Sequence, residues 1–166
     1  MTTERQRLTR HLDEILIPAF EQAGFVRLPL DGDDAKSPEI RSVFPFGRLR
    51  RPCAGGVEQV EIQLDKNKLP AFRINFAVIP AGGIQHAVGP VKLEDMWIHY
   101  LDRYNVLYER GWTRRWFAAA QRAGAGASDA DYRALVERVA ALLPEVERAF
   151  DTHARMPWGG HVRRVG

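Results

Sequence analysis

The chain has 166 residues, of which 45% are hydrophobic, 27% charged and 10% aromatic, and its formal net charge at pH 7 is +3. This length and apolar content predict one globular domain with a substantial core, and they exclude a disordered or fibrous chain. The small net charge hides three basic blocks, residues 40–57, 103–128 and 152–166, which together carry +11 and leave −8 for the rest. Acidic and basic surfaces are therefore expected to be separated.

The composition also narrows the chemistry and the compartment. Cys53 is the single cysteine, which excludes an intrachain disulfide and a cysteine-based zinc or iron–sulfur site. The first ten residues lack the apolar core of a secretory signal, and no apolar run reaches the roughly 18 residues of a membrane span. A cytoplasmic protein without membrane attachment is expected. Arginine outnumbers lysine 20 to 4, which suits bidentate contacts to carboxylate or phosphate but is equally explained by a genome of biased base composition.

The opening segment is predicted to be a bent helix. Apolar residues recur at the spacing of one helical face at Leu8, Leu12, Ile15, Leu16, Ala19, Phe20 and Ala23. Thr3 and Gln6 are spaced as a capping box, and Gly24 supplies the helix stop. Pro18 lies inside the pattern, so it should kink the helix or divide it near Ile17.

Extended segments and loops follow the first helix. Residues 25–30 are short and apolar enough for a strand, and residues 31–38 form an acidic, turn-rich loop. Residues 40–46 are predicted to be extended, with Pro45 indicating an edge strand or a bulge. Residues 47–56, with three arginines, a proline and two glycines at their end, are predicted to form the loop of a hairpin.

The clearest strands are residues 60–65 and 72–78, in which apolar and polar residues alternate. A short polar segment joins them, so an antiparallel pair is the simplest topology. Pairing apolar with apolar residues places Gln63 opposite Arg73 or Asn75 on the other face.

The second half of the chain is predicted to be mostly helical. Residues 80–90 are glycine-rich and predicted to be a loop, and residues 93–110 place their aromatic residues on one helical stripe. Residues 112–123 fit a strand or a helical turn equally well. Ser128 begins another helix, which Pro144 should kink or divide.

These elements predict an α+β fold. Residues 1–155 form a single domain with an antiparallel sheet of about four or five strands, a kinked N-terminal helix and C-terminal helices. Residues 156–166 form an irregular basic tail.

Three short motifs in the first half carry a resemblance: Ala23-Gly24-Phe25, Glu61-Ile62-Gln63-Leu64 and the strand from Phe72 to Val78. Together they resemble a family of uncharacterised bacterial domains, the domain-of-unknown-function family four-three-zero-four. The chain departs from the family pattern at Asp65, Lys66 and Ala77. The resemblance implies an α+β fold and no settled activity, and it draws attention to Gln63 and Asn75.

The first candidate site is the polar face of the strand pair. It comprises Glu61, Gln63, Asp65, Arg73 and Asn75. Carboxylate, amide and guanidinium groups within a few ångströms would suit a small polar ligand or a loop of a partner protein. The alternative is that this face is simply solvated, because alternating polar residues are typical of an exposed sheet face.

Catalysis has little support in the sequence. Cys53 lies in a basic loop without an accompanying motif, and His99 and Asp102 alone do not make a metal site. Gly82 and Gly83 follow a strand but lack the continuation of a phosphate-binding loop. No catalytic residue, metal or cofactor is expected.

The second candidate is a nucleic-acid interface. Its phosphate contacts would come from Arg48, Arg50, Arg51, Arg114, Arg115, Arg163 and Arg164, with base stacking on Trp112 and Trp116. This interpretation requires the three basic blocks to meet in space.

The function predicted first is non-catalytic binding of a protein or a small polar ligand. Analogy with small bacterial α+β domains adds an immunity-type or antitoxin-type role in binding a partner protein. Nucleic-acid binding is the alternative, and the oligomeric state is left open.

Overall fold

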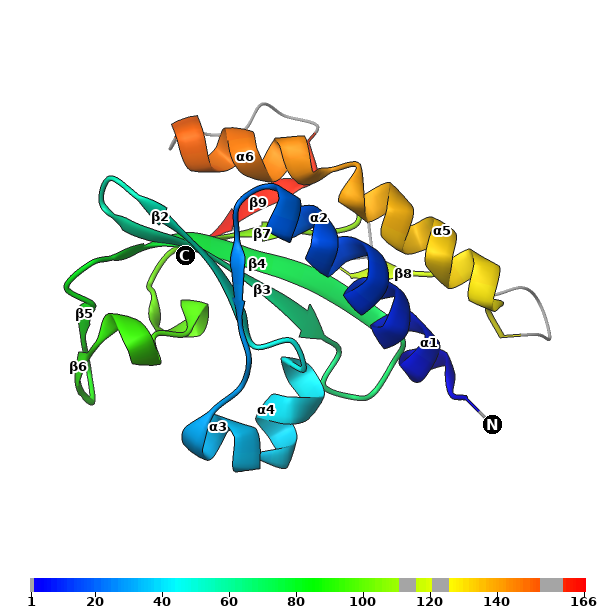
Figure 1. Cartoon of the computed structure of the whole chain (residues 1–166), viewed down its shortest axis with the longest axis horizontal. Coiled ribbons are helices and arrows are strands. Elements are labelled where there is room, and N and C mark those ends of the chain that lie inside the picture. The colour runs from blue at the N-terminus through cyan, green and yellow to red at the C-terminus, as the bar shows by residue number, and fades with distance from the viewer. Residues whose placement is uncertain (1, 111–115, 121–125, 153–159) are drawn as a thin grey trace.

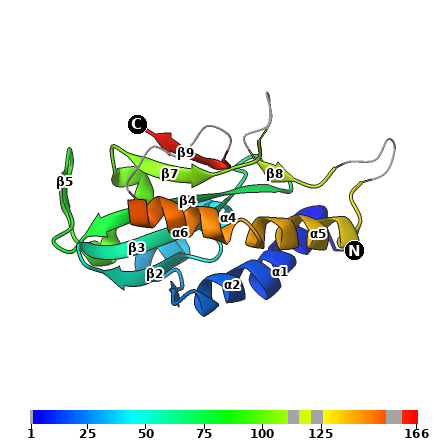
Figure 2. The ribbon, with the colours of Figure 1, turned by 90° about the horizontal axis from the view of Figure 1, so that it is seen from above.

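The computed structural model of the chain describes residues 2–110, 116–120, 126–152 and 160–166 (Figure 1). Helices α1, α2, α5 and α6 lie above an antiparallel sheet in Figure 1, while α3, α4 and the β5–β6 hairpin lie below it. Figure 2 shows α5 and α6 crossing over the strands. The predicted α+β class is confirmed.

The N-terminal helical segment runs through Pro18 without a break in helical structure. It consists of α1 (Glu4–His11), the π-helical turn η1 (Leu12–Leu16) and α2 (Ile17–Gln22). The Thr3–Gln6 capping box is present. The N–H of Ile17 donates to the carbonyl of Leu12, five residues back. This wider turn precedes the proline in the first turn of α2, where a missing N–H is tolerated.

The main sheet has seven strands among the described residues, more than the predicted four or five. These are β1 (Val26–Leu28), β2 (Arg48–Cys53), β3 (Gly56–Leu64), β4 (Ala71–Pro80), β7 (Tyr104–Leu107), β8 (Phe117–Ala118) and β9 (Val162–Val165). Their order is β1-β2-β3-β4-β7-β9, and β8 pairs with another part of β4. The predicted antiparallel pair is β3 and β4, with Gln63 opposite Arg73 and Glu61 opposite Asn75.

Residues 40–46 were predicted to be extended, and this is wrong for most of them. Residues 32–43 form two short helices, α3 (Gly32–Lys36) and α4 (Pro38–Val43). The Ser37 side chain accepts a hydrogen bond from the N–H of Ile40, and Pro38 occupies the first helical turn, where its fixed φ is favourable. The cap overrides the β-forming residues that follow it.

The predicted loop at residues 47–56 is wrong for Arg48–Cys53, which form β2, although the predicted hairpin tip is found at residues 54–55. Only two residues separate β2 from β3. Gly47, at φ 68°, allows the chain to approach β1 closely, since a Cβ there would lie 2.2 Å from the carbonyl oxygen of Leu28. The arginines of this segment are strand residues that alternate between the two faces of the sheet.

The predicted helix at residues 93–110 is replaced by two 3₁₀ turns and a strand. The turns are η2 (Leu93–Asp95) and η3 (Ile98–Tyr100), and β7 follows them. β7 pairs with β4 on one side and β9 on the other, so tertiary hydrogen bonds override the helical spacing of the aromatic residues. The preceding loop contains a hairpin of β5 (Ile84–His86) and β6 (Gly89–Val91).

The C-terminal part holds two helices and one further strand. Helix α5 (Asp129–Ala140) begins at the predicted cap Ser128, and α6 (Leu143–Thr152) carries Pro144 in its first turn, so the predicted division is found. The tail was predicted to be irregular, and this is wrong for β9, which forms an edge of the sheet. Exposed arginines are compatible with an edge strand. Of the undecided residues 112–123, the structure describes 116–120, which contain β8.

The main core lies between the helices and one face of the sheet. Its strand residues include Val60, Ile62, Leu64, Phe72, Ile74 and Phe76, all buried. A smaller apolar cluster of Ala77, Ile79, Met96 and Ile98 lies on the opposite face, beneath the two 3₁₀ turns. The opposite face is therefore covered over only part of its width.

Candidate functional site

The sheet face turned away from α1, α2, α5 and α6 holds most of the candidate residues, and we call it the second face. It has two parts. The covered half consists of Arg48, Arg50, Gln59 and Glu61 beneath residues 93–98. The open half consists of Gln63, Arg73 and Asn75 with the neighbouring residues Tyr104, Val106, Tyr108, Arg163 and Val165.

The covered half is a hydrogen-bonded cluster centred on a buried carboxyl group. Glu61 Oε1 accepts from the N–H of Ile98 at 2.8 Å and from Gln59 Nε2 at 2.7 Å. Gln59 Nε2 also donates to the carbonyl of Met96 at 3.0 Å. These bonds tie residues 96–98 to strand β3, so Glu61 and Gln59 serve as anchors for the covering segment.

Two arginines complete the cluster. Arg50 donates through Nε to Gln59 Oε1 at 2.7 Å and through Nη2 to the carbonyl of Leu93 at 2.7 Å. Arg48 donates to the carbonyl of Glu94 at 3.0 Å and lies over the Trp97 ring at 4.9 Å. Both guanidinium groups therefore bind the backbone of the covering segment.

The environment of Glu61 favours its protonated form. Burial raises its pKa to about 7, while the bonds from Ile98 and Gln59 and the charges of Arg48 and Arg50 act in the opposite direction. Within the described part of the chain, its second oxygen, Oε2, has no hydrogen-bond partner, and neither has Oδ1 of Asn75, the residue opposite Glu61 in the register. A proton on Glu61 would turn Oε2 from an acceptor without a partner into a donor.

Arg51 lies on the helical side of the sheet. It donates to the carbonyl of Ala23 at 2.7 Å, to Glu147 Oε2 at 2.7 Å and to Glu58 Oε2 at 2.6 Å. These contacts attach β2 to α2 and α6. Arg48, Arg50 and Arg51, which the nucleic-acid interpretation grouped together, thus lie on two faces and each bind other parts of the chain.

The open half brings together three of the five residues of the first candidate site. Gln63 Oε1 accepts from Arg73 Nε at 2.9 Å and from Asn75 Nδ2 at 2.8 Å. The Arg73 guanidinium lies 4.8 Å from the centre of the Trp116 ring. Burial lowers the pKa of Arg73, and Tyr104 acts in the opposite direction. The side chain of Arg73 is therefore held in place from two sides.

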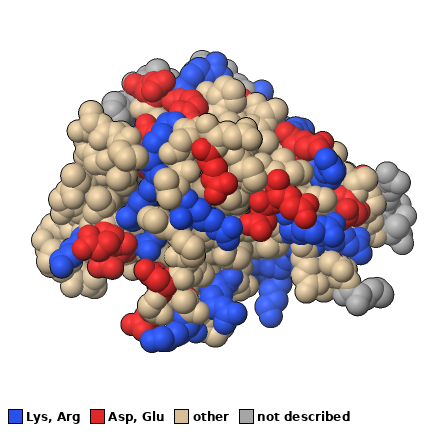
Figure 3. All heavy atoms as spheres, in the orientation of Figure 1, with Lys and Arg blue, Asp and Glu red and all other residues tan. Residues whose placement is uncertain are grey.

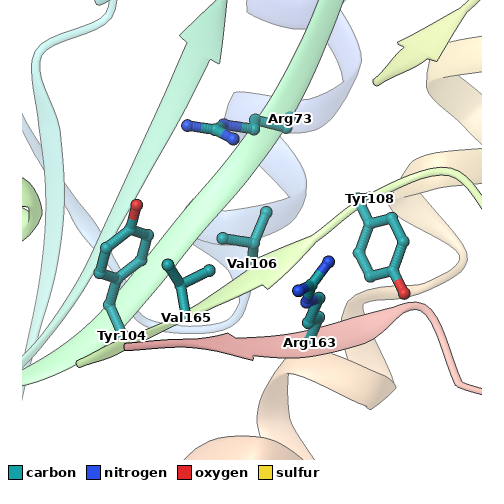
Figure 4. Close-up of a pocket in the computed structure, with 6 residues that line it drawn as sticks. All are labelled: Arg73, Tyr104, Val106, Tyr108, Arg163 and Val165. Atoms are coloured by element: carbon teal, nitrogen blue, oxygen red, sulfur yellow. The ribbon is translucent and has the colours of Figure 1, made fainter. Parts of the chain in front are cut away.

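A pocket of about 160 Å³ opens beside these residues (Figure 4). It is lined by Arg73, Tyr104, Val106, Tyr108, Arg163 and Val165, from β4, β7, β9 and the residue after β7. Val106 pairs with both Asn75 and Arg163 in the sheet register, so the pocket lies on the second face. Among the described residues, no carboxylate lies within 4.0 Å of the guanidinium group of Arg73 or Arg163.

Asp65 lies at the end of β3, away from the pocket. Its Oδ1 accepts from the N–H of Asn67 at 2.8 Å, and its carbonyl oxygen accepts from Arg5 Nη1 at 2.8 Å. These are contacts of a turn and of the N-terminal helix, so Asp65 shapes the β3–β4 connection.

The structure divides the remaining basic residues. Arg163 and Arg164 are both exposed, but Arg163 lines the pocket and Arg164, the next residue of β9, lies on the other face. Arg114, Arg115 and Trp112 lie outside the described residues. In the view of Figure 3, acidic and basic side chains are interspersed, so the expected separation of charge is not seen there.

Sequence reasoning missed several residues of the two halves. Tyr104, Val106 and Tyr108 were assigned to a helix, although residues 104–107 can also be read as alternating. Gln59 lies one residue before the predicted strand, which begins at residue 60, so the prediction does not include it. Extending the alternation Gln59-Glu61-Gln63 backwards would have included it.

Other kinds of site find no support in the described part of the chain. No three His, Cys, Asp or Glu residues there are grouped to hold a metal ion. Among those same residues, no helix has the length and apolar character needed to cross a membrane. Cys53 is a partly buried free thiol.

Comparison with protein-family models, with curated protein sequences and with solved structures finds no match to this chain. The resemblance to family four-three-zero-four therefore stays a prediction.

Proposed function

We propose that the protein is a non-catalytic binding domain that takes a protein or a small polar ligand on the open half. The observation that carries this proposal is the arrangement of Arg73. Its guanidinium is held by Gln63 and Trp116 and borders a pocket, with no carboxylate of the described residues within 4.0 Å. A positioned but uncompensated charge beside a hollow is a typical feature of a binding site.

The covered half supports the choice of the open half. Its polar groups bond to the backbone of residues 93–98, which leaves them little capacity for an external ligand. Gln63, Arg73 and Asn75 bond to one another instead. A partner protein of the immunity or antitoxin kind would meet this face with an acidic side chain, and a small ligand would enter the pocket.

The test is affinity capture from an extract of the native host with the wild-type protein and matched variants. Arg73→Gln and Gln63→Ala alter the open half. Arg133→Gln is the control, because Arg133 is an exposed residue of α5 on the helical side. Bound proteins, small molecules and nucleic acids are identified by mass spectrometry and sequencing.

We expect a stoichiometric protein or small molecule that the wild type and Arg133→Gln retain and that both open-half variants lose. Material retained equally by all four proteins would count against the open half. Recovery of RNA or DNA alone, with a filter-binding affinity that falls steeply with salt, would favour the nucleic-acid alternative instead.

A further inference from the structure

We propose that the pocket between β4, β7 and β9 binds a small organic acid, with its carboxylate against Arg73 and Arg163 and its apolar body on Val106 and Val165. This inference rests on the proposed binding function and names its ligand class. The pocket joins a residue of the polar strand pair to one of the C-terminal basic block (Figure 4).

The positive charge that borders the pocket favours an anionic ligand. Two guanidinium groups border it, and no carboxylate among the described residues lies within 4.0 Å of either. Burial of Arg73 opposes its charged form, because a partly desolvated cation loses hydration that no carboxylate of the described residues replaces. A ligand carboxylate would replace it, and arginine binds carboxylates through two parallel hydrogen bonds.

The spacing of the strands allows both arginines to reach one ligand. Arg73 belongs to β4 and Arg163 to β9, with β7 between them. Arg163 is level with Asn75, two residues along β4 from Arg73, so the two arginine backbones lie roughly 12 Å apart. Arginine side chains are long enough to bridge that gap from both sides. The Tyr104 hydroxyl group points toward Arg73 and adds a neutral donor at the rim (Figure 4).

The rest of the lining is apolar. Val106 is buried with 4% exposure, Val165 is partly buried beside it, and the rings of Tyr104 and Tyr108 stand at the sides. A hydrated inorganic ion would leave these surfaces without a partner. An acid with an aromatic or branched hydrocarbon body would cover them and add the gain from apolar burial.

The size of the pocket sets the size of the ligand. Its volume of about 160 Å³ is close to the ~150 Å³ of an apolar cavity that accepts benzene. It is below the ~300 Å³ at which pockets for drug-sized molecules begin. One ring or branched chain with a single carboxylate therefore fits the volume.

The side chain of Arg73, in β4, is held in position before a ligand binds. Gln63 Oε1 fixes Arg73 Nε, and Asn75 Nδ2 fixes Gln63 in turn. The Trp116 ring covers the guanidinium plane, which leaves its remaining N–H groups as donors for the ligand. Fixing the donors before binding reduces the entropy lost on association.

Benzoate is the probe for this inference, titrated into the intact protein and followed by calorimetry and by NMR shifts of backbone amides. Three comparison compounds each lack one feature: acetate lacks the ring, benzyl alcohol lacks the charge, and inorganic phosphate has charge without an apolar body. We expect saturable benzoate binding, with affinity about tenfold or more above each comparison compound.

Variants of the two arginines test whether benzoate binds in this pocket. Arg73→Gln and Arg163→Gln should each weaken benzoate binding about tenfold or more, because each removes a charge-assisted contact. Arg164→Gln is the matched control, since Arg164 is an exposed arginine of the same strand on the other face, and it should bind benzoate as the wild type does. Circular dichroism establishes that each variant is folded.

Three results would overturn the inference. They are no saturable benzoate binding, benzoate binding that neither arginine variant weakens, and phosphate binding as tight as that of benzoate with the same arginine dependence. A negative benzoate titration together with capture of a partner that depends on Arg73 would reject the organic acid while keeping the binding face. Loss of both results would reject the proposed function as well.

Discussion

The covered half and the open half of the second face are built from the same kinds of residue, yet they differ in what lies over them. Each has arginines and a glutamine that alternate along neighbouring strands. Over the covered half, residues 93–98 supply carbonyl and N–H partners. Over the open half there is a pocket instead. The covering segment, rather than the strand sequence, decides which polar residues serve the fold.

The two halves are therefore expected to contribute differently to the free energy of unfolding and to binding. A buried polar group that loses its partner costs more than the bond itself contributed, because the remaining group stays desolvated. Substitutions in the covered half should therefore change stability. Substitutions in the open half should change binding and leave stability nearly intact. Four measurements test this difference between the two halves.

The largest effect is expected for Glu61→Ala. It leaves the N–H of Ile98 and the side-chain amide of Gln59 without their bonds to the carboxyl group, in a buried cluster. Urea unfolding should show a loss of about 3 to 5 kcal/mol in the free energy of unfolding. Glu137→Ala, on the exposed face of α5, is the control and should change it by less than about 0.5 kcal/mol. Equal losses in the two variants would contradict the anchoring role.

A second effect of the same order concerns pH. The folded-state pKa of Glu61, about 7, lies above its ordinary value of 4.5, so the folded state retains a proton that the unfolded state releases. The stability contributed is present below pH 4.5 and is lost as the pH rises to 7, by about 3 kcal/mol.

Urea unfolding of the wild type and Glu61→Gln across this range measures the effect. The amide keeps an acceptor and a donor without titrating, so the stability of Glu61→Gln relative to the wild type should increase with pH. A constant difference between the two proteins from pH 4 to pH 8 would show that Glu61 does not titrate in this window.

A smaller loss is expected for Arg48→Met. The methionine keeps the apolar stem but removes the hydrogen bonds to the carbonyls of Glu94 and Met96 and the contact with the Trp97 ring. Thermal and urea unfolding should show a loss of about 1 to 3 kcal/mol. Hydrogen exchange should show faster exchange at residues 96–98. An unchanged exchange pattern would separate Arg48 from the covering segment.

The smallest effect on stability is expected for Arg73→Gln and Arg163→Gln. Because the described residues give neither guanidinium a carboxylate partner within 4.0 Å, each change should alter the free energy of unfolding by less than about 1 kcal/mol. Losses as large as that of Arg48→Met would show that the two halves do not differ as proposed.

Much of the second face could be predicted from alternation alone. The polar–apolar period of residues 60–65 and 72–78 predicted both strands and their antiparallel pairing, but it left Gln63 opposite either Arg73 or Asn75, and the structure pairs it with Arg73. It could not separate Glu61 from Gln63, because both have the same parity. What buries Glu61 is a segment more than thirty residues away, whose aromatic spacing predicted a helix.

The pocket illustrates a second limit. Val162 to Val165 is a run of only four residues with two adjacent arginines, and nothing local in it favours a strand. It becomes one because β7 offers an unpaired edge, which is a tertiary condition. Arg73 and Arg163 therefore entered separate interpretations of the sequence, and the sheet brought them to the same place.

The position of β9 also bears on when the pocket exists and how it empties. The two arginines of the pocket, Arg73 and Arg163, are far apart in the sequence. The cavity therefore forms only after β9 has joined the sheet, and this long-range closure costs chain entropy. Ligand binding in the pocket would thus show that the whole sheet has folded, because the strand pair β3–β4 alone does not form the cavity. Since β9 is a short edge strand, its local opening would also release a ligand while the helices and the core stayed intact.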